Sequence, residues 1–258
     1  TQKSESLNHA YGTNGIITSL FLATDIKRDW YSLVIDCKEF KKTINLLKDF
    51  TSAAINLKLV AVLEKEIVDL MPAWFRSKIN SHKILIQTTL GGLTTIEHIC
   101  RKNDLSVMNL GKEDELENGI SDLVWNHTTL QMRARDKSWT YLQMLLPFNK
   151  EFEFIKKLNK NISNRLLWHL EAVSQQGIPR LAALPVLRWK NEEDLNLIIE
   201  NCKHLGAVIF NPHVITVEGG GLGVTDADQV KAKAKYDPKG LLNPGKLEGW
   251  KKKEIFIN

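Results

Sequence analysis

Apolar and polar residues along this chain alternate, or gather in short blocks, in a way that predicts strands separated by helices. We expect strands at residues 15–22, 30–36, 57–63, 82–90, 105–110, 139–146, 166–174, 181–189, 207–210 and 214–217. Apolar residues at helical spacing predict helices at residues 38–50, 114–132, 148–158 and 191–204. Two more helices are expected to begin near Thr94, from its capping-box spacing to Glu97, and at Asp226, which has the chemistry of an N-cap.

This order of elements limits the fold class. Strand–helix–strand units are compatible with a parallel sheet, but the polar positions within several strands favour an antiparallel sheet. We therefore predict an α+β fold with a mainly antiparallel sheet, helices on one face, and two pseudo-repeated halves that meet near residue 110. No low-complexity linker marks a domain boundary.

The composition is that of an ordinary globular chain. Its 258 residues are 43% hydrophobic, which is enough for one large core or two small ones. No apolar run approaches the roughly 20 residues of a membrane-spanning helix, so we expect no membrane span. Cys37, Cys100 and Cys202 have no metal-binding spacing and cannot all pair, which indicates a reducing compartment and a cytoplasmic location. Because the chain starts at Thr1, we expect a fragment or a processed product.

The charge raises the question of nucleic-acid binding. The net charge is +5, the pI is about 9.0, and eight lysines lie between Lys231 and Lys253. Such a segment can attract a phosphate backbone or an anionic membrane surface, or it can form a solvated helix face and tail. Its aromatic residues, Tyr236 and Trp250, are not interleaved with the lysines as a base-stacking surface requires. The solvated surface is favoured, and we expect no nucleic-acid partner.

Two short segments carry turn chemistry near the chain ends. Gly12-Thr13-Asn14-Gly15 has glycines that permit positive φ and close backbone approach, which suits either a plain β-turn or a flat or phosphorylated ligand. Near the other end, residues 237–240 have type I turn chemistry and residues 243–246 have type II turn chemistry. These consecutive turns either fasten the C-terminus or hold Asn243 and Lys246 toward a ligand.

The same segments carry a family resemblance. Tyr11-Gly12-Thr13-Asn14-Gly15-Ile16-Ile17-Thr18 and Asp237-Pro238-Lys239-Gly240-Leu241-Leu242-Asn243-Pro244-Gly245-Lys246 resemble motifs of the FAD-linked oxidases of the vanillyl-alcohol oxidase and glycolate oxidase type. The resemblance implies that residues 1–24 include the last strand of a flavin-binding domain whose remainder is absent. It further implies a substrate or cap domain at residues 25–220 and a segment at residues 221–258 that returns to the flavin.

The resemblance also implies FAD as the cofactor. Its binding residues are then expected to be Gly12, Thr13, Gly15, Ile16, Ile17, Asn243 and Lys246. In the family, a glycine-rich loop before the first motif holds the pyrophosphate, and nothing here resembles it. We therefore expect an incomplete FAD site, weak or no FAD binding by this chain alone, and the FAD-binding domain of a parent protein as its partner.

Other family motifs are missing. The 2-hydroxy-acid members usually have Glu-His-Gly-Ile-Gly where this chain has Glu218-Gly219-Gly220-Gly221, and their histidine-containing metal segment has no counterpart. Both departures argue against a metal ion and weigh against a 2-hydroxy-acid substrate. We predict no metal site.

Candidate catalytic residues come from the histidines. Strand alternation puts His169 and Glu171 on one face, with their Cβ atoms about 7 Å apart, as a base with its carboxylate or as a solvated sheet face. His127 lies where related enzymes offer polar substrate contacts, and Arg133 follows it with a guanidinium suited to a carboxylate. Taken singly, His127 and Arg133 are each also compatible with an exposed helix surface. We predict that a substrate pocket draws on His127, Arg133, His169 and Glu171.

Together these features predict the C-terminal, substrate-binding part of an FAD-dependent oxidoreductase. Such an enzyme would oxidise a small alcohol or hydroxy acid by hydride transfer to the flavin, and this chain alone would be inactive. The alternatives are a noncatalytic α+β ligand-binding module derived from that family and a basic nucleic-acid-binding fragment.

Overall fold

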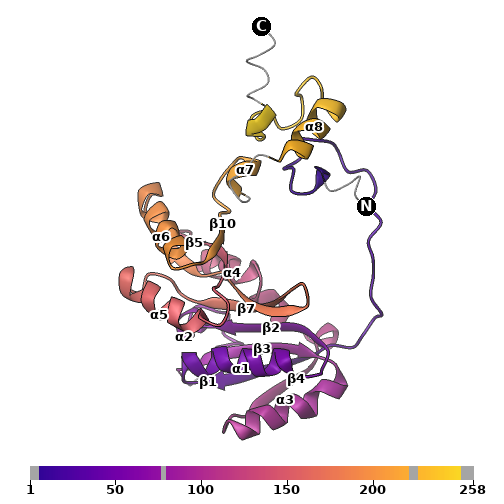
Figure 1. Ribbon diagram of the computed structural model, residues 1–258. Coiled ribbons are helices and arrows are strands. Elements are labelled where there is room, and N and C mark those ends of the chain that lie inside the picture. The colour runs from indigo at the N-terminus through magenta and orange to yellow at the C-terminus, as the bar shows by residue number, and fades with distance from the viewer. Residues whose placement is uncertain (1–5, 77–79, 221–225, 251–258) are drawn as a thin grey trace. The chain divides into compact units, whose positions relative to one another are not determined.

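The strands pack side chains on both faces of one large sheet. A computed structural model of the chain describes residues 6–76, 80–220 and 226–250, and divides it into two units, residues 27–209 and residues 1–26 with 210–258. The sheet has eight strands in the order β10-β6-β8-β7-β2-β3-β1-β4 (Figure 1). Their bounds are β1 Tyr31–Cys37, β2 Leu57–Leu63, β3 His82–Thr88, β4 Val107–Lys112, β6 Gln143–Leu145, β7 His169–Gln175, β8 Ile178–Ala183 and β10 Val208–Phe210.

Strand pairing confirms the predicted antiparallel sheet. Antiparallel registers join β1 with β3 and β4, β2 with β3 and β7, and β8 with β6 and β7. The β7–β8 hairpin turns at Gln176 and Gly177, which have φ of 53° and 80°. Two central residues with positive φ are the usual way to match the twist of a tight hairpin.

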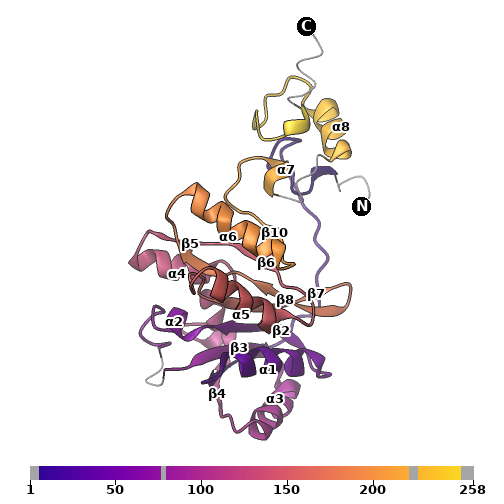
Figure 2. The ribbon, with the colours of Figure 1, turned by 60° about the vertical axis from the view of Figure 1, so that its left-hand side comes forward.

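The sheet is built from two copies of one β-α-β-β-α-β unit, as in ferredoxin-like folds. The first copy is β1, α1 (Phe40–Ser52), β2, β3, α3 (Leu90–Lys102) and β4, and the second is β6, α5 (Glu151–Asn161), β7, β8, α6 (Glu192–His204) and β10. Read from the sheet edge to its centre, each copy places its fourth, first, third and second strand in turn. The copies meet where β2 pairs with β7, beside each other in Figure 2. The predicted pseudo-repeat is therefore confirmed, and the first copy ends near residue 110 as expected.

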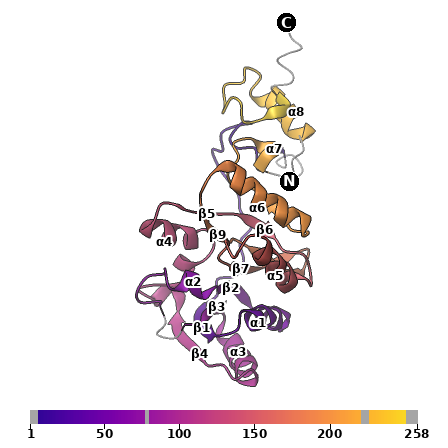
Figure 3. The same cartoon turned by 90° about the vertical axis from the view of Figure 1, so that its left-hand side faces the viewer.

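The long helices α1, α3, α5 and α6 contribute to one hydrophobic cluster on one sheet face (Figure 3). Strand alternation sends Val60 and Val62 of β2 into that cluster, while Leu59, Ala61 and Leu63 enter a second cluster on the opposite face. Shorter elements cover the second face, so neither face of the central strands is solvated. These shorter elements are α2 Lys65–Val68, the 3-10 helix η3 Ile120–Leu123, α4 His127–Arg135, and the paired strands β5 Trp139–Tyr141 and β9 Val186–Arg188.

Several predicted elements in this unit need correction. The helix expected at residues 114–132 is instead the 3-10 helix η2 (Glu113–Glu115), η3 and α4, because buried Leu123 and Val124 interrupt the helical path. The strand expected at residues 139–146 divides into β5 and β6, which belong to different sheets. Helix α3 begins at Leu90, so Thr94 lies inside it and is not its cap. Pro185 does break the predicted strand at 181–189, between β8 and β9.

The smaller unit contains α7 (Val217–Gly220) and α8 (Ala227–Tyr236). Asp226 caps α8, since its carboxylate accepts the N–H groups of Asp228 and Gln229. The strands predicted at residues 15–22 and 214–217 are wrong for this chain: residues 15–30 form neither helix nor strand, and α7 begins at Val217. A strand needs a hydrogen-bonding neighbour, and in the described residues none pairs with residues 15–22. Ile16, Ile17 and Phe21 are accordingly 79%, 75% and 99% exposed.

In the described parts of the chain, no helix combines the length and the apolarity needed to cross a bilayer.

Candidate functional site

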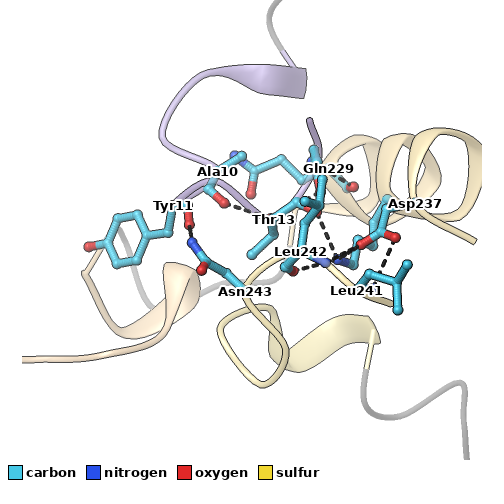
Figure 4. A network of polar contacts seen from close by, with 10 residues as sticks. Ala10, Tyr11, Thr13, Gln229, Asp237, Leu241, Leu242 and Asn243 are labelled. Carbon is cyan, nitrogen blue, oxygen red and sulfur yellow. Dashed lines mark hydrogen bonds and ion pairs between the residues drawn. The ribbon is translucent and has the colours of Figure 1, made fainter. Parts of the chain in front are cut away.

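The two motifs from opposite chain ends lie in contact within the smaller unit. The Nδ2 atom of Asn243 donates to the carbonyl oxygen of Tyr11 at 2.5 Å (Figure 4). Gly12 has a φ of +66°, and a Cβ atom there would lie 2.9 Å from Asn243 Nδ2. Both observations explain why glycine occupies this position, since another residue would be strained and crowded. The turn is closed by Thr13, whose N–H and hydroxyl both donate to the carbonyl oxygen of Ala10.

A buried lysine joins the motifs. The ammonium group of Lys233, on α8, donates to the carbonyl oxygens of Thr13 and Leu242 at 2.8 Å each and to the carboxylate of Asp237. Lys233 is only 2% exposed. The hydrogen bond from Lys233, with those from the N–H groups of Leu242 and Leu241, lowers the pKa of Asp237 to about 2, and the charge of Lys233 adds a smaller effect. The network therefore holds residues 10–14 against the C-terminal segment.

Amide side chains add to the same contact. Asn14 donates to the carbonyl oxygens of Ser6 and Gln229 at 3.0 Å each, and the Gln229 side chain donates to the carbonyl oxygen of Asn8 at 2.7 Å. Gln229, Lys233 and Asp237 are four residues apart and share one face of α8 and its end. That spacing was the sequence signal for this network. The sequence alone did not distinguish Lys233 from a solvated lysine on the helix surface.

The predicted tail turns are confirmed. Gly240 N–H donates to Asp237 O at 3.0 Å, and Lys246 N–H donates to Asn243 O at 3.3 Å. Gly245, the third residue of the second turn, has the positive φ of 84° that a type II turn requires, and Gly240, which ends the first turn, has a φ of 64°. Asn243 is exposed apart from its bond to Tyr11, and Lys246 is half-buried.

A buried glutamate fastens the segment that follows the turns. Glu218, 5% exposed, accepts the N–H groups of Glu248 and Gly249 at 3.0 Å each. The N–H of Val217 donates to the carbonyl oxygen of Lys246 at 2.8 Å. In this chain the glutamate of the Glu218-Gly219-Gly220 motif therefore supports the tail rather than facing open space.

A cavity of about 370 Å³ lies beside the first motif, and its lining includes Gly12, Asn14, Gly15, Ile16 and Ile17. Its volume is at the lower end of the range for small-molecule sites. Glycine backbone and isoleucine side chains suit one face of a flat ring system. The residues present therefore fit part of a flavin, and the predicted cofactor residues, Asn243 and Lys246 included, all lie in this unit.

The predicted catalytic residues lie in the larger unit. His169 and Glu171 lie on the sheet face opposite Leu170, and His169 Nε2 is 3.0 Å from Glu171 Oε1. His169 is 0% exposed and Glu171 7%. Although this is an ion-pair distance, neither ring nitrogen of His169 has a hydrogen bond of good geometry within the described residues. The pairing of these residues is as predicted, but the alternative of a solvated sheet face is wrong.

His127 and Arg133 are exposed on α4, which covers the same sheet face. His127 Nδ1 lies 3.2 Å from Ser121 O, and Arg133 donates to Trp139 O at 2.7 Å. Glu171 lies near the start of this helix, because its Oε1 atom accepts the N–H of Trp125 at 2.6 Å. The structure thus brings His169, Glu171 and the start of α4 together, while Arg133 is engaged by a backbone carbonyl. Their catalytic roles stay predictions.

Sequence reasoning missed Glu64, a titratable residue at the junction of the two repeats. Its Oε2 atom accepts the N–H of Trp168 at 2.7 Å, and its own N–H donates to Trp168 O at 2.9 Å. Burial is the main cause that raises the pKa of Glu64 to about 7, and the charge of Glu66 adds to it. A glutamate directly after a buried apolar strand, as in Leu63-Glu64, was the available signal.

Comparisons with known proteins bear on the fold. No protein-family model and no curated protein matches the sequence. Among solved structures, alkyldihydroxyacetonephosphate synthase has a TM-score of 0.53 at 14% identity, covering 84% of this chain and 43% of that one. 4-Ethylphenol oxidase from Gulosibacter chungangensis, in complex with isoeugenol, has a TM-score of 0.52 at 10% identity, covering 84% of this chain and 53% of that one.

At these identities the likeness concerns the fold, and this chain spans only about half the length of either structure. Both are members of the FAD-linked oxidase family that the two motifs resemble. The chain therefore has the fold of a C-terminal domain of the FAD-linked oxidases.

Proposed function

We propose that this chain is the substrate-binding, C-terminal part of an FAD-dependent oxidoreductase that acts on a small alcohol or hydroxy acid. The observation that carries the proposal is the contact between residues 11–14 and the turns at 237–246, through Asn243 and Lys233. Motifs more than 200 residues apart, both resembling flavin-site segments, are hydrogen-bonded together beside a cavity. A purely structural tail gives no reason for an adjacent glycine- and isoleucine-lined cavity.

The exposed segment at residues 15–22 supports the proposal that this chain binds a partner domain. Its β-branched and aromatic side chains are largely exposed, and in the described residues its backbone has no sheet neighbour. Such a segment is suited to add to the edge of another sheet. In the proposal that sheet is the one of the FAD-binding domain of the parent protein, and pairing with it would form the strand that the sequence predicts.

Each part of the chain then has a distinct task. A bound flavin would supply the acceptor for a hydride from a substrate carbon. Gly12, Gly15, Ile16 and Ile17 would contact the flavin through backbone and apolar side chains, and Asn243 and Lys246 would face it from the tail. The larger unit would bind the substrate, with Glu171 and His127 near the start of α4 as polar contacts.

The decisive experiment is the absorption spectrum of the longest native polypeptide that contains this chain. A flavin band is expected there, and its absence after gentle purification and FAD supplementation would end the proposal. This chain alone should bind FAD weakly or not at all. Titration followed by quenching of flavin fluorescence checks this, and a micromolar or tighter site would contradict the expected incompleteness.

A noncatalytic ligand-binding module is the second candidate. It is favoured by Glu218, because the carboxylate of the altered Glu-Gly-Gly-Gly motif is occupied by the N–H groups of Glu248 and Gly249. Bound flavin without reduction by any alcohol or hydroxy acid would favour this candidate over the enzyme.

A further inference from the structure

The turn at residues 124–127 has an unusual residue at its tip. The N–H of His127 donates to the carbonyl oxygen of Val124 at 3.1 Å, which closes the turn. Trp125, at the first central position, has a φ of +54°. Glycine, asparagine or aspartate normally occupy central turn positions with positive φ, and a bulky residue there is strained. Trp125 is also 39% exposed.

Both flanks of this turn are fixed. Val124 is 0% exposed, and Thr128, which is 1% exposed, donates its hydroxyl hydrogen to the carbonyl oxygen of Leu123 at 2.6 Å. Between them, Trp125, Asn126 and His127 are exposed. A conformational change can therefore be confined to residues 125–127 without disturbing the core.

The strained backbone is held by one carboxylate oxygen. Trp125 N–H donates to Glu171 Oε1 at 2.6 Å, and that same atom is 3.0 Å from His169 Nε2. His169 is fully buried, and in the described part of the chain neither of its nitrogens makes a hydrogen bond of good geometry. A buried imidazole without hydrogen bonds is costly, and a catalytic role or a bound water or ion is among the explanations for such a group.

Two opposing energetic contributions act on the backbone of Trp125. The hydrogen bond to a carboxylate favours the closed turn, whereas the positive φ of a tryptophan favours rotation away from it. Rotation would break this hydrogen bond, and opening of the whole turn would also break the one from His127 N–H to Val124 O. Rotation would free Glu171 Oε1 for another donor and open a path toward His169.

We propose that residues 125–127 are a lid over a buried His169–Glu171 site that admits a hydroxyl-bearing ligand. The hydroxyl hydrogen is donated to Glu171 Oε1 in place of Trp125 N–H, and the hydroxyl oxygen accepts a hydrogen bond from His169. The inference rests on the proposed function in one respect, namely that the ligand is the alcohol to be oxidised. The lid itself requires no flavin.

Matched substitutions at Trp125 test the lid. Trp125→Pro removes the N–H and excludes positive φ, so it holds the turn open, whereas Trp125→Gly keeps the N–H and accepts positive φ without strain. Both remove the indole, so the comparison isolates the backbone at this position, namely its N–H and its access to positive φ. Val124 is already extended, with φ of −117° and ψ of −176°, as a residue before proline requires.

The readout is the rate at which diethyl pyrocarbonate modifies His169, followed by mass spectrometry with exposed His98, on α3, as the reference. His169 in Trp125→Pro should react at least about tenfold faster than in Trp125→Gly, which corresponds to about 1.4 kcal/mol in the opening equilibrium. Buried His82 reports global unfolding, and its rate should be the same in both variants. Equal rates of His169 modification in the two variants would overturn the proposal that residues 125–127 form a lid.

Asn149 provides the control position. It has a φ of +58°, and its N–H donates to the buried carboxylate of Glu151 at 3.1 Å, but its neighbours Phe152 and Phe154 belong to the other sheet face. Asn149→Pro and Asn149→Gly should leave the His169 rate unchanged. A change as large as that from Trp125→Pro would show general loosening and refute a local lid.

Benzyl alcohol is the probe for the ligand. It should slow modification of His169 in the unsubstituted chain, while toluene, which lacks the hydroxyl, should not. No protection at millimolar benzyl alcohol, or equal protection by toluene, would overturn the hydroxyl ligand. A parent protein without flavin would end the proposed function and leave the lid result standing, so the two failures are distinguishable.

Discussion

Replacing Glu64 with glutamine tests how burial controls the junction of the two repeats. The β2–β7 register pairs Leu63 with His169, and Glu64 extends this contact by one residue through its two bonds to Trp168. Glutamine keeps a side-chain carbonyl oxygen that can accept the Trp168 N–H. The substitution therefore removes a titratable charge while retaining the hydrogen bond.

The pH dependence follows from the direction of the shift. Burial raises the pKa of Glu64 to about 7 in the folded chain, from an ordinary value of 4.5. Between these pH values the folded state keeps a proton that the unfolded state loses, so stability falls as the pH rises and levels off above 7. Since one pKa unit is worth about 1.4 kcal/mol, ionised Glu64 costs about 3 kcal/mol at pH 8. It costs nothing at pH 4, where both states are protonated.

Urea unfolding of both chains, followed by tryptophan fluorescence from pH 4 to pH 8, measures this. Glu64→Gln should be more stable than the unsubstituted chain by about 3 kcal/mol at pH 8 and equal to it at pH 4. The control is Glu66→Gln, since Glu66 is exposed and its charge is a lesser cause of the shift. A Glu64→Gln chain that is less stable at pH 8 refutes the reasoning. A control that removes most of the pH dependence would show that charge, not burial, dominates.

Three further predictions concern the smaller unit. Lys233→Met leaves the carbonyl oxygens of Thr13 and Leu242 without their donor, which should cost about 2 kcal/mol and speed amide exchange of residues 8–14 about 30-fold. Lys231→Met, on the exposed side of the same helix, should have no effect, and equal exchange in both variants would count against the network. Asp237→Asn should weaken the loss of stability between pH 4 and pH 2, because the carboxylate with a pKa near 2 stabilises the fold only while it is ionised, and acid titration by circular dichroism measures this. Asn243→Ala in the parent protein should lower flavin loading or turnover with little change in melting temperature, whereas a lower melting temperature with normal flavin chemistry would assign Asn243 a structural role alone.

The sequence predicted much of the larger unit because its strands and helices bury regular apolar patterns. Residues 57–63 were predicted as a strand and form β2, and Asn191 and Gly206 bound α6 as expected. The segment at 114–132 was harder, since apolar residues anchored to the sheet there override helical continuity. The strand at 15–22 failed for another reason: strand formation depends on a neighbour that local sequence does not specify.

In the candidate site, too, features set by local sequence were predicted and features set by distant residues were not. Turn chemistry identified residues 237–246 because proline and glycine restrict the backbone locally. The burial of Lys233 and Glu218 depends on carbonyl and N–H groups that lie far away in the sequence, so composition alone presented them as surface charges. The contact of His169 with Glu171 followed from strand periodicity, but the complete burial of His169 did not.

The smaller unit is assembled from the first and last segments of the chain, and this has a consequence for how the protein is made. Residues 10–14 leave the ribosome long before Lys233 and Asn243 are synthesised, so this unit cannot assemble until after residues 27–209 have emerged. Because the loop that must close contains residues 27–209, its entropy cost would be large if that stretch were a random coil. Prior folding of the two repeats replaces most of that loop with ordered structure. A truncation after residue 225 should therefore leave the repeats intact, while residues 10–14 would lose every partner that α8 and the tail supply.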